Sequence, residues 1–91
     1  MNITYDPEFT KKLERQILYI SGDKPQAAKK FKKDIISRIK TIPKNPKIYR
    51  KSFYFDNENI RDLIFKGYTI SFKITENEII VFGFLKWEEE F

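Results

Sequence analysis

The 91-residue sequence contains no cysteine and no histidine. Without cysteine the chain can form no disulfide, no thiolate nucleophile and no cysteine-ligated zinc site. Without histidine it lacks the side chain most often used for proton transfer at neutral pH, which is also the commonest metal ligand. Any catalysis would have to use lysine, arginine, tyrosine, aspartate or glutamate. These two absences favour a binding protein over an enzyme.

Long apolar runs and glycine-rich loops are also missing. Residues 79–85 form the longest uncharged run late in the chain, with seven residues, whereas a membrane-spanning helix needs about 20. The N-terminal segment carries Asp6 and Glu8 and has no apolar signal-peptide core. The three glycines stand apart, and no pair of carboxylates has a spacing that suggests a divalent metal site. We therefore predict a cytoplasmic protein with no membrane segment, no metal and no cofactor.

Positive charge is concentrated in the middle of the chain. The net charge is +5, but residues 24–51 hold 11 lysines and arginines against one aspartate, which gives 11 − 1 = +10. Residues 74–91 hold one lysine against five glutamates, which gives 1 − 5 = −4. A basic block raises the local potential and attracts polyanions or an acidic protein. The same block is also typical of a solvated helix face.

Two helices are predicted in the first half. Asp6, Pro7 and Glu8 suit a helix start, because Asp can accept hydrogen bonds from the free amides of the first turn and Pro is pre-shaped for the first helical position. Apolar residues at helical spacing then form one stripe: Phe9, Leu13, Ile17 and Ile20. Residues 21–23 should stop this helix. A second helix should open at Lys24-Pro25 and end at Pro43, with an apolar face formed by Ala27, Ala28, Phe31, Ile35, Ile39 and Ile42. A connection of about four residues predicts an antiparallel hairpin.

The remaining segments favour strands. The predicted strands are Asn2–Tyr5, Ser52–Asp56, Ile60–Phe65, residues 68–75 and Glu78–Leu85. The last is apolar on both faces, so it should be central or covered on its second face. The predicted fold class is α+β, with one domain over residues 1–91: an N-terminal strand, then a two-helix hairpin packed on one face of a small antiparallel sheet of three or four further strands. One hairpin can cover one face only, so we expect the other face to meet water or a partner.

Several ordered segments together resemble a known family. They are the apolar pattern from Phe9 to Ile20, the pattern from Ala27 to Pro43, and above all the block IRDLIFKGYTISFKI from Ile60 to Ile74, followed by IIVF from Ile79 to Phe82. Over nearly the whole chain this set resembles the RelE/ParE superfamily of bacterial toxins, which belong to type II toxin–antitoxin systems of the plasmid-stabilisation type. The resemblance implies a growth-inhibiting toxin that is neutralised in a hetero-oligomer with a small, acidic antitoxin.

The superfamily has two main activities, and the sequence bears on the choice between them. One branch inhibits DNA gyrase, and the other cleaves messenger RNA on the ribosome. If this chain were a metal-independent nuclease, Arg61, Lys73 and Lys86 could supply positive charge and Tyr68 could move a proton. However, Glu88–Glu90 stand where the nuclease branch usually has basic residues, and Thr69 stands where many relatives carry arginine. We therefore favour ParE-like gyrase inhibition without catalysis.

Two alternatives stay open. The first is a RelE-like, ribosome-dependent messenger RNA endonuclease, and the second is a non-toxic nucleic-acid-binding module. The gyrase branch also commonly ends in a basic tail, so the acidic run Glu88–Glu90 departs from both branches and leaves the target open, gyrase or ribosome.

Candidate contact residues follow from these readings. Arg50, Lys51 and Arg61 are the candidates for target binding. The candidates for antitoxin binding are Phe82, Phe84, Lys86 and Trp87. Two of these residues have structural alternatives, because Arg61 could pair with Asp62, Glu78 or another acid, and Trp87 could pack back on the sheet. Tyr68, a nuclease candidate, could likewise fill the core.

Overall fold

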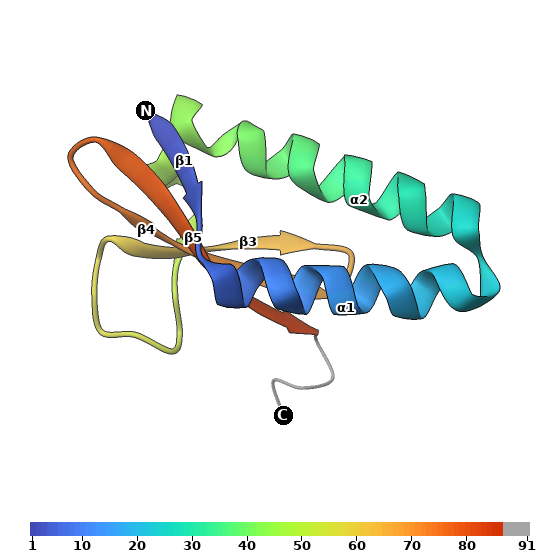
Figure 1. The fold of residues 1–91 in the computed structure, drawn as a ribbon. Coiled ribbons are helices and arrows are strands. Elements are labelled where there is room, and N and C mark those ends of the chain that lie inside the picture. Colours follow the sequence, from blue (N-terminus) through green and yellow to red (C-terminus); the bar gives the residue numbers. More distant parts are fainter. Residues whose placement is uncertain (87–91) are drawn as a thin grey trace.

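Apart from one N-terminal strand, helices occupy the first half of the chain and strands the second (Figure 1). The computed structural model describes residues 1–86. Its elements are β1 (Asn2–Tyr5), α1 (Pro7–Asp23), α2 (Pro25–Lys40), the short 3-10 turns η1 (Ile42–Lys44) and η2 (Pro46–Ile48), β2 (Arg50–Lys51), β3 (Ile60–Phe65), β4 (Tyr68–Ile74) and β5 (Glu78–Lys86). The predicted α+β class is confirmed.

Helix α1 begins as the sequence predicts but continues further. The Oδ1 atom of Asp6 accepts a hydrogen bond of 2.8 Å from the backbone N–H of Glu8, and Pro7 takes the first helical position. The predicted stop at residues 21–23 is wrong, because these residues form the last turn of α1 and a single residue, Lys24, connects the helices. Lys24 is not helical because Pro25 follows it, and a residue before proline avoids the helical region.

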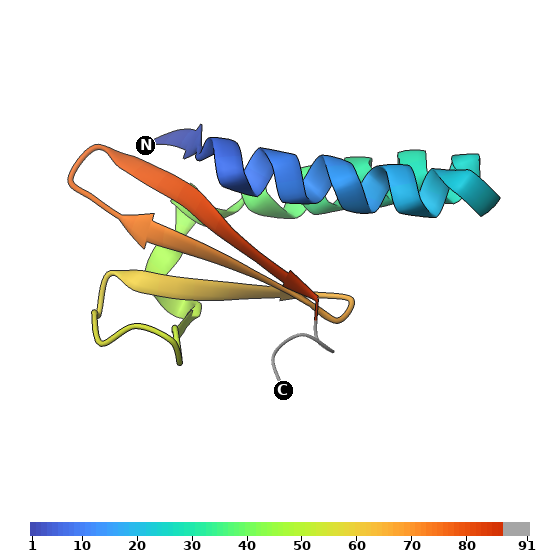
Figure 2. The same ribbon diagram turned by 60° about the horizontal axis from the view of Figure 1, so that its bottom comes forward.

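The two helices form the predicted hairpin and cover one face of the sheet (Figure 2). Every predicted residue of the apolar face of the second helix is buried except Ala27, which is exposed. Phe9 of α1 meets Phe84 of β5 edge to face, with ring centroids 6.0 Å apart, and Phe31 of α2 lies 5.2 Å from the ring of Tyr68. Burial of these side chains provides most of the driving force for the hairpin to dock.

The strands form one sheet in the order β1-β5-β4-β3-β2. The prediction of a purely antiparallel sheet is wrong, because β1 pairs with β5 in parallel, with Asn2 opposite Glu78 and Tyr5 opposite Val81. Tight hairpins impose antiparallel pairing only on consecutive strands. All the other elements lie between β1 and β5 in the sequence, so no tight turn fixes the direction of β1 relative to β5. The central position predicted for Glu78–Leu85 is confirmed, since β5 lies between β1 and β4.

A one-residue bulge in β5 divides its aromatic side chains between the two faces. Ser71 of β4 pairs with Gly83, whereas the next residue, Phe72, pairs with Val81, so Phe82 has no partner of its own. Val81 and Phe84 therefore both lie on the helix-covered face although they are three positions apart in the sequence. Phe82 and Gly83 lie on the opposite face, which we call the second face.

The segment between β2 and β3 crosses part of the second face. Its prediction as a strand over Ser52–Asp56 is wrong, because only Arg50–Lys51 pair with β3 and the segment then leaves the sheet. Phe55 packs on Phe82 edge to face at 5.5 Å. The aromatic residues that suggested a strand instead use their rings for tertiary contacts, since strand propensity depends strongly on context. The second face is thus open only in part.

We predict opposite effects for alanine at two glycines. A Cβ atom at Gly83 would lie 2.9 Å from the Cβ of Ser71, whereas one at Gly22, inside α1, would meet nothing within 4 Å. Gly83→Ala should therefore lower the free energy of unfolding by about 1–3 kcal/mol. Gly22→Ala should leave it unchanged or raise it by up to about 1 kcal/mol. Urea unfolding of both variants measures the difference, and equal stabilities would contradict the bulge packing.

Candidate binding surface

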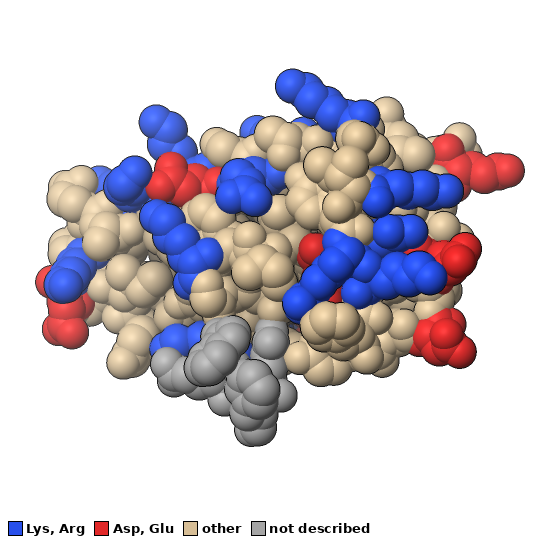
Figure 3. All heavy atoms as spheres, turned by 180° about the vertical axis from the view of Figure 1, so that it is seen from behind, with Lys and Arg blue, Asp and Glu red and all other residues tan. Residues whose placement is uncertain are grey.

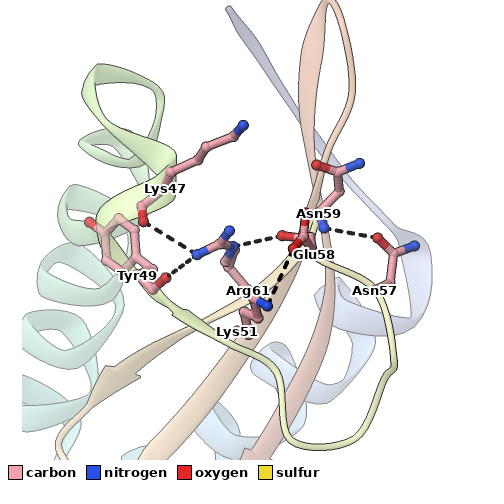
Figure 4. Close-up of polar contacts among 7 residues, drawn as sticks. All are labelled: Lys47, Tyr49, Lys51, Asn57, Glu58, Asn59 and Arg61. Atoms are coloured by element: carbon pink, nitrogen blue, oxygen red, sulfur yellow. Dashed lines mark hydrogen bonds and ion pairs between the residues drawn. The ribbon is translucent and has the colours of Figure 1, made fainter.

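Arg61 of β3 is held by backbone carbonyls (Figure 4). Its Nε donates to the carbonyl oxygen of Glu58 at 2.8 Å, and its NH1 donates to those of Tyr49 at 3.0 Å and Lys47 at 3.3 Å. The guanidinium therefore ties the chain before β2 to the loop that enters β3. The ion pair considered as an alternative, with Asp62 or Glu78, is not formed, because Asp62 points to the opposite face and binds Arg50.

Arg50 and Asp62 form a partly buried cluster on the second face. The carboxylate of Asp62 is fully buried, accepts a hydrogen bond of 2.8 Å from the Ser71 hydroxyl and lies 3.4 Å from Arg50 NH2. The guanidinium of Arg50, 37% exposed, sits 4.2 Å above the ring centroid of Phe53. A buried carboxylate needs such partners because an unpaired buried charge is costly. Arg50 thus serves the fold while part of its guanidinium still reaches solvent.

Two of the residues considered for a nuclease, Tyr68 and Lys86, lie opposite each other in the sheet, whereas Arg61 and Lys73 lie apart from them. Tyr68 is buried, its ring stacks on Phe84 at 5.1 Å, and its hydroxyl accepts a hydrogen bond of 2.9 Å from Gln16. Arg61 pairs with Phe72, four residues along β4 from Tyr68, which corresponds to about 13 Å. Lys73, exposed, alternates to the second face. Lys86 pairs with Tyr68 and sits 5.9 Å from the ring centroid of Tyr19.

Burial raises the pKa of the Tyr5 hydroxyl, so Tyr5 stays protonated at neutral pH and is poorly suited to accept a proton. Within residues 1–86 no group of three or more acidic side chains is placed to hold a metal ion. Neither α1 nor α2, the long helices of that region, could cross a membrane.

Two of the four residues predicted to bind an antitoxin come together in the described part. Phe82 is half-buried on the second face and Phe84, 7% exposed, packs in the core beneath the helices, yet both line one groove beside the end of β5. Lys86 lies at the end of β5 beside α1. Trp87 lies outside the described residues. Alternate residues of a regular strand share a face, and the bulge removes that relation between Phe82 and Phe84.

Sequence reasoning missed an apolar groove that opens on the second face and reaches α1. It has a volume of about 360 Å³, and its lining includes Lys12 of α1, Tyr54 and Phe55 of the segment after β2, and Phe82, Phe84 and Leu85 of β5. Next to it Phe53 is 76% exposed, and Ile64 of β3 is 47% exposed. The aromatic run 53–55 was the signal for this groove, although it was interpreted as a strand.

Basic side chains outnumber acidic ones on one face of the molecule. Figure 3 shows lysines and arginines distributed over the face that is hidden in Figure 1, with fewer acidic side chains between them. Lys51, a predicted target contact, is exposed and pairs with Glu58 at 3.4 Å. A groove with aromatic walls and a basic surrounding suits an acidic partner with apolar anchor side chains.

Comparison with known proteins identifies the kind of protein that this chain resembles. Residues 3–91 match the family model of the ParE toxin of the type II toxin–antitoxin system, parDE. Among solved structures, a chain described as the chromosomal ParDE TA system from P. aeruginosa superposes with a TM-score of 0.78 at 15% identity, over 94% of this chain and 95% of that chain. That likeness establishes the fold. A comparison with curated protein sequences gives no match.

Because the Arg61 guanidinium donates hydrogen bonds to three carbonyls, we predict that another positively charged side chain cannot substitute for it without loss of stability. Arg61→Lys keeps the charge but cannot reproduce the forked geometry, and it should lower the free energy of unfolding by about 1–3 kcal/mol. Lys51→Met, at the paired position in β2, removes an exposed ion pair and should change stability by less than about 1 kcal/mol. Thermal or urea unfolding compares the two. Wild-type stability of Arg61→Lys would show that these hydrogen bonds contribute little.

Proposed function

The chain belongs to the ParE toxin family of type II toxin–antitoxin systems, and we propose that it inhibits DNA gyrase by binding rather than by catalysis. We further propose that a small acidic antitoxin neutralises it by occupying the groove on the second face. The carrying observation is that the basic and phenolic side chains suited to RNA cleavage are mostly separated or already engaged, whereas three consecutive exposed aromatic residues, Phe53–Phe55, lie at one apolar groove, which Tyr54 and Phe55 line.

Binding without catalysis agrees with the engagement of each candidate group. General acid–base chemistry needs a side chain within hydrogen-bond reach of the proton that it moves, in a position open to substrate. The Tyr68 hydroxyl instead lies beneath α1 against Gln16, and the Arg61 guanidinium is directed at carbonyl oxygens of its own chain. Inhibition by binding requires only a stable surface, so the engagement of Tyr68 and Arg61 within the fold does not impair it.

The proposed target contacts are Arg50, Lys51 and Arg61, with different parts to play. Lys51 projects into solvent and can exchange its ion pair with Glu58 for an acidic group on the target. Arg50 keeps 37% of its side chain exposed while it pairs with Asp62. Arg61 is half-buried and acts by holding the segment before β2 in place. The surface therefore presents Arg50 and Lys51 directly, and Arg61 is a positioning residue.

The proposed antitoxin contacts centre on Phe82 and extend to Lys86 at the end of β5 and to Trp87, the next residue in the sequence. Phe82 lies at the floor of the groove beside Tyr54 and Phe55. An apolar side chain of the antitoxin inserted there would remove aromatic surface from water, and acidic side chains around it would meet Lys12. Phe84 contributes by holding this end of β5 in the core.

Growth arrest with intact messages is the expected outcome of brief induction. Purified protein should inhibit the supercoiling activity of gyrase, and Tyr68→Phe should inhibit it equally, because no step uses the hydroxyl proton. The measurements are a supercoiling assay and an RNA cleavage profile from induced cells. Messages cut within codons, with cutting lost in Tyr68→Phe, would instead establish the ribosome-dependent nuclease.

Affinity for the antitoxin should depend on Phe82. We expect Phe82→Ala to weaken binding at least about tenfold, which corresponds to about 1.4 kcal/mol, because truncated aromatic anchors dominate interface energies. Ile48→Ala is the matched control, since Ile48 is 70% exposed on η2 and does not line the groove. Calorimetry with the purified antitoxin measures both variants, and thermal unfolding checks that both are folded. Equal affinity of the two variants would place the antitoxin elsewhere.

A further inference from the structure

Three lysines of α2 form a straight basic stripe along the helix. At 3.6 residues per turn, Lys29, Lys33 and Lys40 lie within about 40° of one another around the axis and span about 16 Å along it. All three are exposed, and a shallow depression that also involves Lys32, Ile36 and Ser37 joins them. We call these three lysines the α2 stripe.

No acidic side chain neutralises the α2 stripe. Asp34 is the only acid of α2 and lies about 120° away around the axis, where it pairs with Lys30 at 3.1 Å and Lys66 at 3.9 Å. None of the three stripe lysines has an ion pair with any residue from 1 to 86. On α1, Glu14 lines a separate pocket between the two helices, together with Lys32 of α2. The stripe thus keeps its full positive potential.

The surroundings of the stripe indicate the class of partner. A protein partner would need an apolar anchor, yet none of the exposed large apolar residues within 1–86 lies on α2. Single-stranded nucleic acids are bound largely by stacking bases on aromatic rings, and α2 has only one aromatic residue, the buried Phe31. Lysines with a small hydroxyl residue between them suit the phosphate oxygens of a duplex.

We propose that the α2 stripe binds the phosphate backbone of duplex DNA without sequence preference. Phosphates of one strand follow one another every 3.4 Å along the duplex axis, so about 16 Å of lysines spans about five of them. This contact does not depend on gyrase inhibition or on the antitoxin groove. It would concentrate the protein on DNA through electrostatic attraction. The affinity for DNA should therefore fall steeply as the salt concentration rises.

The test is binding of the purified full-length protein to a fluorescent 20-base-pair duplex across a series of salt concentrations. Each phosphate neutralised contributes about 0.9 to the slope of log K against log salt concentration. The triple variant Lys29→Gln, Lys33→Gln, Lys40→Gln should therefore flatten the slope by about 2.7. Glutamine and lysine have similar helix propensities, so α2 should remain intact, and circular dichroism checks this.

A matched triple variant removes the same charge elsewhere. Lys11→Gln, Lys30→Gln and Lys51→Gln each break an exposed ion pair, with Glu8, Asp34 and Glu58 respectively. We expect this variant to keep most of the wild-type slope. Equal flattening in both triples would overturn the proposal in favour of diffuse attraction. Failure of the wild type to bind duplex DNA at 50 mM salt would overturn it too, as would tighter binding to single-stranded or duplex RNA of equal length.

Discussion

The close approach of Ser71 to Gly83 is the contact on which the two-faced character of the protein depends. Without a side chain at Gly83, β4 and β5 can pair through a one-residue bulge, and the alternation of β5 is reversed beyond it. Phe84 then fills the core against Phe9 and Tyr68, whereas Phe82 turns to the second face and meets Phe55. A regular strand would have placed both phenylalanines on one face and left either the core or the groove incomplete.

The chemistry of the site follows from how its polar groups are satisfied. Arg61 and Tyr68 resemble catalytic residues in a list of residue types, but each is already engaged within the fold: Arg61 with three carbonyls and Tyr68 with Gln16 and Phe84. Asp62, whose carboxylate is fully buried, is balanced by Arg50 and Ser71. The groups that remain available to another molecule are lysines and aromatic rings, which are typical of recognition surfaces.

The sequence predicts those features that local patterns determine. The capping Asp6 and the stripe from Phe9 to Ile20 specify elements whose side chains interact with near neighbours, and these predictions are confirmed. The strand predicted at residues 68–75 also forms, as β4, but both of its faces are buried. Features that depend on contacts between distant segments were not predicted from the sequence. The direction of β1 depends on a strand more than seventy residues away, and the segment at Phe53–Phe55 has strand-like composition but packs onto β5. The groove was missed for the same reason, because two segments distant in sequence form its walls.

The pairing of β1 with β5 also sets the timing of folding during synthesis. Asn2–Tyr5 are made before the carbonyls and amides that they need, because these belong to Glu78–Val81, more than seventy residues further along the chain. Contacts with such long sequence separation form late and slowly. A nascent chain that has not yet passed Val81 leaves an edge of β4 unpaired as well. β1 therefore takes its place in the sheet only after β5 has been made.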